Sequence, residues 1–424
     1  MNLPTMLKVR QHFDAPRVAD IPGQVELQLR ALNLEQTVRA GDQVAITAGS
    51  RGIANIADIT KAIVTHFRDL GASPFVVPAM GSHGGGTAEG QRKILESYGI
   101  TAAYIGAEIR SSMETVIVDE TPQGIPVHFD RNAYEADHVV VSGRVKPHTC
   151  FVGDIESGLH KMMLIGLGKH EGAKIYHRAI QDFSFLEIIH AVSDVVLKKC
   201  GVLAGVAIVE NAYDETGTIE CVAPDAFFTR ETELLKLARQ WMPKLPFDAI
   251  DLLIVDAIGK NISGSGMDTN VVGRKYNDHR ATEQDSVTCK RIFVRGLTSE
   301  THGNACGIGI AEFTNRRCAN VIDHDATRIN CLTGGHPSAG AVPVTFETDR
   351  EAIEAALETV GLCNPDDARM VQIPDTLHLR DVLVSTAFLD EIRSRPDLEL
   401  QGDPQELSFD SSGHLVDLSW SATH

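Results

Sequence analysis

The sequence lacks the features that mark several large classes of protein. No apolar run reaches the roughly 20 residues that a membrane-spanning helix needs, and the opening MNLPTMLKVRQHFD has no apolar signal segment. We therefore expect a cytoplasmic protein. Eight cysteines are scattered over 424 residues without a CxxC pair. This scarcity argues against a zinc ribbon, an iron–sulfur cluster or a disulfide scaffold.

Basic residues are too few to balance the acidic ones. The 39 Lys and Arg residues stand against 57 Asp and Glu residues, which gives a formal net charge of −18. Such a charge repels nucleic acids and anionic membranes, so we expect neither as a partner. A small anionic substrate is compatible with it, because a few cationic side chains set the field inside a cleft. The sequence leaves oligomerisation open.

The pattern that is present belongs to a globular α/β protein. Hydrophobic residues make up 43% of the chain and charged residues 23%, close to the globular average. Short β-branched runs alternate with helical patterns, which is typical of parallel sheets flanked by helices. Helices are expected after Asn55, which can cap the first, and from Ser184 to Lys199. Strands are expected at 44–48, 75–77, 139–141, 206–209, 252–255 and 292–294.

Length and pattern together favour two domains. A chain of 424 residues can bury two cores of ordinary size. Pro243 and Pro246 follow a helical pattern and precede a new strand, which indicates a break. We predict an N-terminal domain over residues 1–245 and a C-terminal α/β domain over 246–424. The fold class is then α/β, with mainly parallel sheets flanked by helices and an active site in the cleft between the domains.

Four polar, glycine-rich segments directly follow predicted strands. In open α/β sheets, ligands bind beyond the carboxyl ends of the strands. We therefore expect the four segments to converge on one crevice. They are TAGSR at 47–51, GSHGGGT at 81–87, SGRVKPH at 142–148 and GKNISGSGMD at 259–268.

Two histidines in these segments are candidate acid/base groups. Glycines around His83 allow backbone amides to approach a ligand, and Thr87 can cap a following helix; the alternative is a tight turn with a surface histidine. The spacing is not GxGxxG, so a dinucleotide site is not indicated. His148 follows Pro147, which holds its predecessor extended. Alone it is more typical of a structural histidine.

Two further motifs are ambiguous when read singly. Lys161 in SGLHK is either a nucleophile or a solvated lysine. His177 in KIYHR is either a metal ligand or a solvated helix residue, because no HExxH spacing accompanies it. The same ambiguity applies to His160, His170 and His190.

Taken together, Arg51, the GSHGGGT loop, the KPH motif, SGLHK and His177 resemble the nickel-pincer lactate racemase family of 2-hydroxyacid racemases and epimerases. The motifs occur in the same order and at similar separations, and Lys161 and His177 are spaced as in that family. The resemblance covers about residues 40 to 280, where SGSGMDTN at 263–270 is similar to the family's proline–aspartate loop.

The resemblance implies an N-terminal domain that carries a nickel-pincer nucleotide on Lys161 through a thioamide. His177 would bind the nickel, and cofactor-maturation proteins would install the group. His83 and His148 would be the paired acid/base groups, and Arg51 would hold the substrate carboxylate. Further implied contacts are Ser82, Gly84, Ser157, Gly158 and Asp268 for the cofactor.

This chemistry suits a 2-hydroxyacid, whose α-hydrogen is too weakly acidic for an unaided side-chain base. Inversion is easier when hydride leaves to an electrophilic cofactor while a histidine takes the hydroxyl proton. An arginine fork matches the carboxylate.

The chain also departs from the family pattern. Ala48-Gly49-Ser50 stands where the family has an acidic residue, and Val272–Tyr276 replaces a tyrosine–glutamine pair and a lysine. We therefore expect a longer or more polar hydroxyacid than lactate. Arg274 and Lys275 would contact it, or would be solvated surface charges.

Two other functions fit parts of the pattern. One is a zinc-dependent hydrolase or lyase that uses His83, His148 and His177 as a three-histidine site. The other is a non-catalytic protein that binds a nucleotide or sugar acid through the glycine loops. Nickel against zinc content distinguishes the first alternative, and inversion of a hydroxyacid distinguishes the second.

Overall fold

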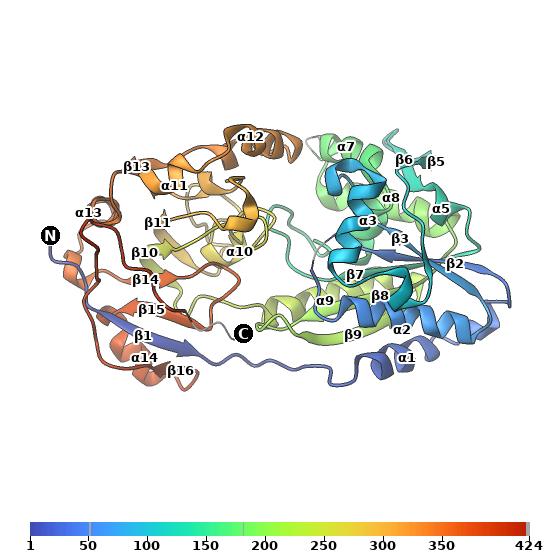
Figure 1. Ribbon diagram of the computed structural model, residues 1–424, viewed down its shortest axis with the longest axis horizontal. Helices are drawn as coiled ribbons and strands as arrows, with labels where there is room; N and C mark the ends of the chain where they lie inside the picture. Colours follow the sequence, from blue (N-terminus) through green and yellow to red (C-terminus); the bar gives the residue numbers. More distant parts are fainter. Residues whose placement is uncertain (51, 181, 421–424) are drawn as a thin grey trace. The chain divides into compact units, whose positions relative to one another are not determined.

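The computed structural model describes residues 1–50, 52–180 and 182–420, and it divides into two compact units (Figure 1). The N-terminal unit consists of Ala15–Met242, and the C-terminal unit consists of Met1–Asp14 together with Pro243–His424. The division after Met242 lies three residues before the predicted boundary. Residues 1–14 differ from the prediction, because the strand β1 (Met6–Gln11) pairs with β15 (Asp381–Ser385) and so belongs to the C-terminal unit.

A six-stranded sheet forms the centre of the N-terminal unit. Its strands are parallel from β4 to β8, and β9 runs antiparallel to β8. The inner strands are buried on both faces, which explains their continuous β-branched runs. The strand order is β4 (Glu108–Ile109), β3 (Ser73–Pro78), β2 (Gln43–Ala48), β7 (His138–Arg144), β8 (Val202–Glu210) and β9 (Thr216–Val222).

Helices pack apolar stripes against the two faces of this sheet. Ser184 and Glu187 form the expected capping box at the start of α8. Asn55 precedes α2 as expected but does not cap it: its backbone is left-handed, and its side chain donates to Thr216 instead. The helices are α1 (Ile21–Arg30), α2 (Ile56–Asp69), α3 (Ala88–Ser97), α4 (Ala102–Ile105), α5 (Arg131–Tyr134), α6 (Leu159–Lys161), α7 (Lys169–Ala179), α8 (Phe185–Lys199) and α9 (Phe227–Trp241).

Two shorter elements complete this unit. A two-stranded antiparallel ribbon is formed by β5 (Thr115–Glu120) and β6 (Pro126–Asp130). Between α6 and α7, residues Met162–Gly166 form a π-helix. Such wide turns are frequent at functional sites.

An eight-stranded sheet forms the centre of the C-terminal unit. It is parallel from β13 to β14 and antiparallel beyond. All six predicted strands lie within strands of the two sheets, and the mainly parallel α/β class is confirmed. The strand order is β13 (Val344–Phe346), β12 (Phe313–Asn315), β11 (Thr288–Val294), β10 (Ala249–Val255), β14 (Met370–Ile373), β15, β1 and β16 (Leu398–Leu400). Its helices are α10 (Thr269–Val272), α11 (Arg316–Asn320), α12 (His324–Thr333), α13 (Asp349–Leu357) and α14 (Leu389–Ser394).

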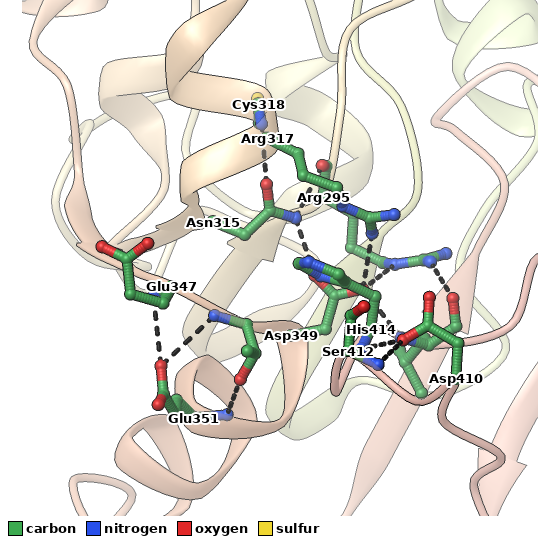
Figure 2. Close-up of polar contacts among 12 residues, drawn as sticks. Arg295, Asn315, Arg317, Cys318, Glu347, Asp349, Glu351, Asp410, Ser412 and His414 are labelled. Carbon is green, nitrogen blue, oxygen red and sulfur yellow. Dashed lines mark hydrogen bonds and ion pairs between the residues drawn. The ribbon is translucent and has the colours of Figure 1, made fainter.

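The chain's last described segment folds back onto this sheet through a buried ionic network (Figure 2). Asp349, fully buried at the start of α13, accepts hydrogen bonds from Arg295 (3.1 Å) and Asn315 (2.7 Å). It also accepts one from the backbone N–H of Leu415 (2.9 Å), and Trp420 donates to Asp256, which follows β10 (2.8 Å). These contacts fix an irregular segment that no sequence period predicts.

Across residues 1–50, 52–180 and 182–420, no helix has both the length and the apolar character to cross a membrane.

Candidate active site

The loop after β3 presents His83, whose ring is exposed. The Nδ1 atom of His83 shares a hydrogen bond with the hydroxyl of Ser50, which lies in the loop after β2. Tyr98, directly after α3, in turn donates to the carbonyl of Ser50 (2.8 Å). The structure thus brings together side chains from two of the four glycine-rich segments.

Gly84 is required in this loop both for its backbone conformation and for its close approach to α3. Gly84 has φ of +66°, and a Cβ there would lie 2.6 Å from the backbone carbon of Gly90. Any other residue would therefore force the loop away from α3. Thr87 caps α3 by accepting from the N–H of Gly90 (3.1 Å). Ser82 is partly buried in the same loop, next to His83.

The buried Lys169 holds the His83 loop in place through hydrogen bonds. Lys169 is fully buried, and its ammonium donates to the carbonyl of Pro78 (2.8 Å) and to Gln91 (3.0 Å). Gln91 then donates to the carbonyls of Gly81 (2.9 Å) and His83 (3.3 Å). An ion pair with buried Asp130 (3.3 Å) balances the lysine charge. The loop is therefore attached to the core before His83 and at the His83 carbonyl itself.

Lys169 and Asp130 both have shifted pKa values. Burial lowers the pKa of Lys169 and raises the pKa of Asp130, and their mutual attraction opposes both shifts. Lys169 also adopts a positive φ of 52°. Its sequence neighbourhood, GLGKHEG, gave no periodic signal of such burial.

His148 lies beyond β7, held by backbone groups. Its Nδ1 atom accepts from the N–H groups of Cys150 (3.0 Å) and Phe151 (3.1 Å), and its own N–H donates to Glu156 (2.8 Å). The ring stacks on Phe151 at 4.2 Å between centroids. Because Nδ1 is the acceptor, the proton of the neutral ring resides on Nε2.

Lys161 and His177 lie on either side of the π-helix. The pKa of His177 is lowered first by burial and then by the charge of Lys161, so the ring is neutral near pH 7. A neutral imidazole is the form that binds a metal. The Lys161 ammonium lies 5.6 Å from the centroid of Phe151, the ring on which His148 stacks.

Ser157 and Gly158 connect the KPH motif to the Lys161 turn. The hydroxyl of Ser157 accepts from the N–H of Lys146 (2.8 Å) and donates back to the carbonyls of Lys146 (2.5 Å) and Arg144 (3.4 Å). Gly158 has φ of +97°, and a Cβ there would lie 2.8 Å from a carboxylate oxygen of Glu231. Both residues therefore have a structural function where the resemblance implies cofactor contacts.

The implied contacts of the second domain lie in the C-terminal unit. Asp268 is buried and caps α10 by accepting from the N–H of Asn270 (2.9 Å). Arg274 has a fully buried side chain that donates to Glu312 (3.1 Å), so the solvated-charge interpretation is wrong for it. Its burial favours a structural function. The backbone N–H of Lys275 donates to Asp285 (3.1 Å).

The remaining sequence candidates have mixed outcomes. Arg51 lies outside the described residues. His160 is buried and pairs with Glu231 (2.9 Å). The described residues contain no group of three or more His, Cys, Asp or Glu side chains that could hold a metal ion. The alternative of a three-histidine zinc site at His83, His148 and His177 therefore gains no support from this part of the chain.

Sequence reasoning missed three buried charges that support the site, Lys169, Glu156 and Glu231. The one available signal was Glu231, an acidic residue between the apolar residues Phe227 and Leu234–Leu235 of a helical pattern.

Part of this chain is similar to a known protein family. Residues 17–184 match the family described as the lactate racemase N-terminal domain, and this range holds both histidine loops, Lys161 and His177. The fold is similar to the lactate racemase apoprotein from Thermoanaerobacterium thermosaccharolyticum, with a TM-score of 0.53 and 12% identity, covering 87% of this chain and 94% of that one. A protein from Thermotoga maritima gives a TM-score of 0.50 and 13% identity over 87% and 99%. The search of curated proteins returned no match.

Proposed function

We propose that this chain is an isomerase that racemises or epimerises a 2-hydroxyacid, because residues 17–184 match the lactate racemase N-terminal domain. The observation that carries the proposal is the placement of His83 and His148. They follow β3 and β7, two parallel strands on either side of β2. Two strand spacings separate such loops by about 10 Å, which leaves room for a small substrate between two imidazoles.

The two histidines differ in how they are held. His83 exchanges protons next to the Ser50 hydroxyl, and the Gln91 contacts hold its backbone in place. His148 presents a donor at Nε2, while two backbone N–H groups occupy Nδ1. To take up a second proton, the His148 ring must displace those N–H groups. We therefore propose that the turn at Cys150–Phe151 moves when His148 acts as a base.

Lys161 and His177 suit a nickel-pincer nucleotide attached to this unit. One turn of wide helix separates the α6 lysine from α7, and burial keeps His177 neutral for a metal. When bound, such a cofactor supplies an acceptor for the α-hydrogen. Ser82 and Gly84 of the His83 loop, and Ser157 and Gly158 directly before α6, remain proposed cofactor contacts. Asp268 and Lys275 remain proposals for cofactor and substrate contacts from the C-terminal unit.

The proposed substrate is a small anionic hydroxyacid that is longer or more polar than lactate. Support comes from the altered 272–276 segment and from Lys275, which is partly exposed. Arg51 is the proposed carboxylate contact, on sequence grounds alone. A bidentate guanidinium would orient the C1 carboxylate so that the α-carbon faces one imidazole on each side.

The first experiment tests cofactor attachment. Protein produced together with cofactor-maturation proteins should carry a covalent mass adduct on Lys161 and bound nickel. Lys161→Ala should lose the adduct, whereas Lys174→Ala, at an exposed lysine of α7 paired with Glu171, should keep it. Unmodified mass and absent nickel in the unaltered chain would remove the cofactor assignment.

The second experiment tests the reaction. Cofactor-loaded protein should invert at least one compound in a panel of D- and L-2-hydroxyacids that includes dicarboxylates and sugar acids. Retention of the original α-hydrogen in deuterated water supports hydride transfer, and wash-in of deuterium supports deprotonation. A loaded protein that inverts none of the panel would refute the isomerase proposal.

A further inference from the structure

Helix α9 carries two charged residues, Glu231 and Arg239, whose hydrogen-bond partners lie outside the helix. It follows β9, outside the family-matched range 17–184, and buries Phe227, Leu234 and Leu235 in the core. Between them, Glu231 is 1% exposed. A buried carboxylate lowers stability unless hydrogen bonds compensate for its lost hydration, so its partners indicate its function.

Glu231 is bound to the turn that carries Lys161. Its Oε2 atom accepts from the backbone N–H of His160 (3.2 Å) and pairs with the Nδ1 atom of the same residue (2.9 Å). Both side chains are buried. The residue next to Lys161 is therefore fixed through its backbone and its ring by one carboxylate.

Gly158 makes this close approach feasible. Its positive φ turns the chain directly before α6, and its missing Cβ leaves the 2.8 Å that separates the Cβ position from Oε1 of Glu231. Among the described residues, Oε1 has no hydrogen-bond partner. The carboxylate thus lies against Gly158 and binds His160, the residue directly before Lys161.

Two turns later, the same helix reaches the segment that carries His148. Arg239 donates to Glu156 (2.8 Å) and to the carbonyl of Gly153 (3.3 Å). Glu156 is fully buried, and its second oxygen accepts from the N–H of His148 (2.8 Å). One rigid helix therefore holds the two ends of the 148–161 segment.

We propose that Glu231 is a positioning residue for Lys161 and that α9 sets the placement of Lys161 relative to His148. This inference rests on the proposed function for its catalytic meaning, but the positioning itself is a property of the chain without cofactor. A rigid turn presents the lysine amine in one direction, as attachment of a group at a single lysine requires.

The test compares Glu231→Gln with Glu233→Gln. Both remove one negative charge from α9, but Glu233 is exposed and pairs with Arg230 on the same helix. Glu231→Gln keeps the side-chain shape, and Glu231→Asp keeps the charge. Amide hydrogen exchange is measured for residues 157–163 of the cofactor-free protein, together with the rate at which an amine-reactive ester modifies Lys161.

We expect Glu231→Gln to raise exchange in 157–163 by roughly tenfold, the size of one hydrogen bond to a charged group, and to change the rate of Lys161 modification. Glu233→Gln should change neither, and Glu231→Asp should restore part of the protection. In loaded protein, Glu231→Gln should reduce adduct occupancy and kcat while KM stays within about twofold.

The outcomes separate this inference from the proposed function. Unchanged exchange and unchanged lysine reactivity in Glu231→Gln would overturn the positioning assignment, whatever the activity. If the unaltered chain never gains an adduct, the proposed function fails, yet the exchange comparison still decides the inference. Should Glu231→Asp fail to restore protection, the contact would not depend on the carboxylate and the proposal would fall.

Discussion

Replacing Lys169 by methionine removes the cation that holds the His83 loop to the core. Methionine has a similar volume and no charge, so the change deletes the contacts to Pro78, Gln91 and Asp130 without creating a large cavity. Asp130 then stays buried without its cationic partner. We expect the N-terminal unit to lose stability and the loop at 79–87 to gain mobility.

The magnitude follows from the burial of the pair. Removing one partner of a buried ion pair costs about 3–5 kcal/mol, because the other charge stays without compensation. Lys169 and Asp130 are both fully buried, so solvent does not screen the loss. We therefore expect the free energy of unfolding of the N-terminal unit to fall by about 4 kcal/mol near pH 7.

The effect should also depend on pH. Burial already raises the pKa of Asp130, and losing Lys169 removes the attraction that opposes this shift. A carboxyl group whose folded-state pKa is raised stabilises the fold while protonated and loses that contribution as pH rises from its ordinary value near 4 to the raised value. The Lys169→Met variant should therefore be closer to the unaltered protein at pH 5 than at pH 8.

The two tryptophans allow each unit to be followed separately. Trp241 lies on α9 in the N-terminal unit, and Trp420 lies in the C-terminal unit. In a Trp420→Phe variant, tryptophan fluorescence therefore reports the unfolding of the N-terminal unit alone. Urea unfolding is measured in this background by Trp241 fluorescence. Lys169→Met with Asp130→Asn should recover at least about 2 kcal/mol, and Lys174→Met, at an exposed site, should change little. A loss below about 1 kcal/mol for Lys169→Met, or no recovery in the double variant, would refute the reasoning.

Further predictions concern the site and the C-terminal unit. His83→Ala and His148→Ala should each lower kcat/KM by roughly 10²–10⁴ without unfolding the protein; near-normal turnover excludes that residue as an essential acid/base group. Gly158→Ala should destabilise the N-terminal unit by about 2 kcal/mol in the same fluorescence assay, because the backbone and Glu231 both oppose a Cβ; an unchanged midpoint contradicts this. Asp349→Asn should raise amide exchange across 410–420 and leave residues 157–163 unchanged, since it removes acceptors for the tail; protection retained at 410–420 would show that the network does not hold the segment. Arg51→Lys should lower kcat/KM at least about tenfold, because an ammonium cannot form the planar fork; equal activity would remove the carboxylate contact.

The local sequence pattern was sufficient to predict the six strands and the start of α8. Ile46, Val76 and Val140 lie in β-branched runs because their strands are buried on both faces, and Ser184 with Glu187 determines a helix start within four residues. These signals are short-range. A sequence shows them without any knowledge of distant partners.

Features that depend on distant partners were not predictable. In the sequence, Lys169 resembles a surface lysine, because its partners Asp130 and Pro78 are distant along the chain. Arg274 likewise resembles a solvated charge, because its partner Glu312 is distant. Asn55 has the composition of a cap, yet its side chain bonds to Thr216, 161 residues away. In each case the deciding neighbour is far along the chain.

The same separation applies to the site. The four glycine-rich segments indicate where the loops are, because they follow strands. They do not show that Ser50 meets His83, or that α9 supports the lysine turn. The π-helix at Met162–Gly166 has no periodic pattern of its own. Geometry of this kind requires coordinates.

The pairing of β1 with β15 has a consequence for synthesis on the ribosome. The strand β1 is made well before its partner, because Asp381–Ser385 emerges some 370 residues later. At about 5–20 residues per second, residues 6–11 wait roughly 20–75 s for that partner. Ala15–Met242 can complete its sheet in the meantime. During the wait, Lys8 and Arg10 place positive charges on a strand that could otherwise pair with another nascent chain, the protection that charged side chains give to open sheet edges.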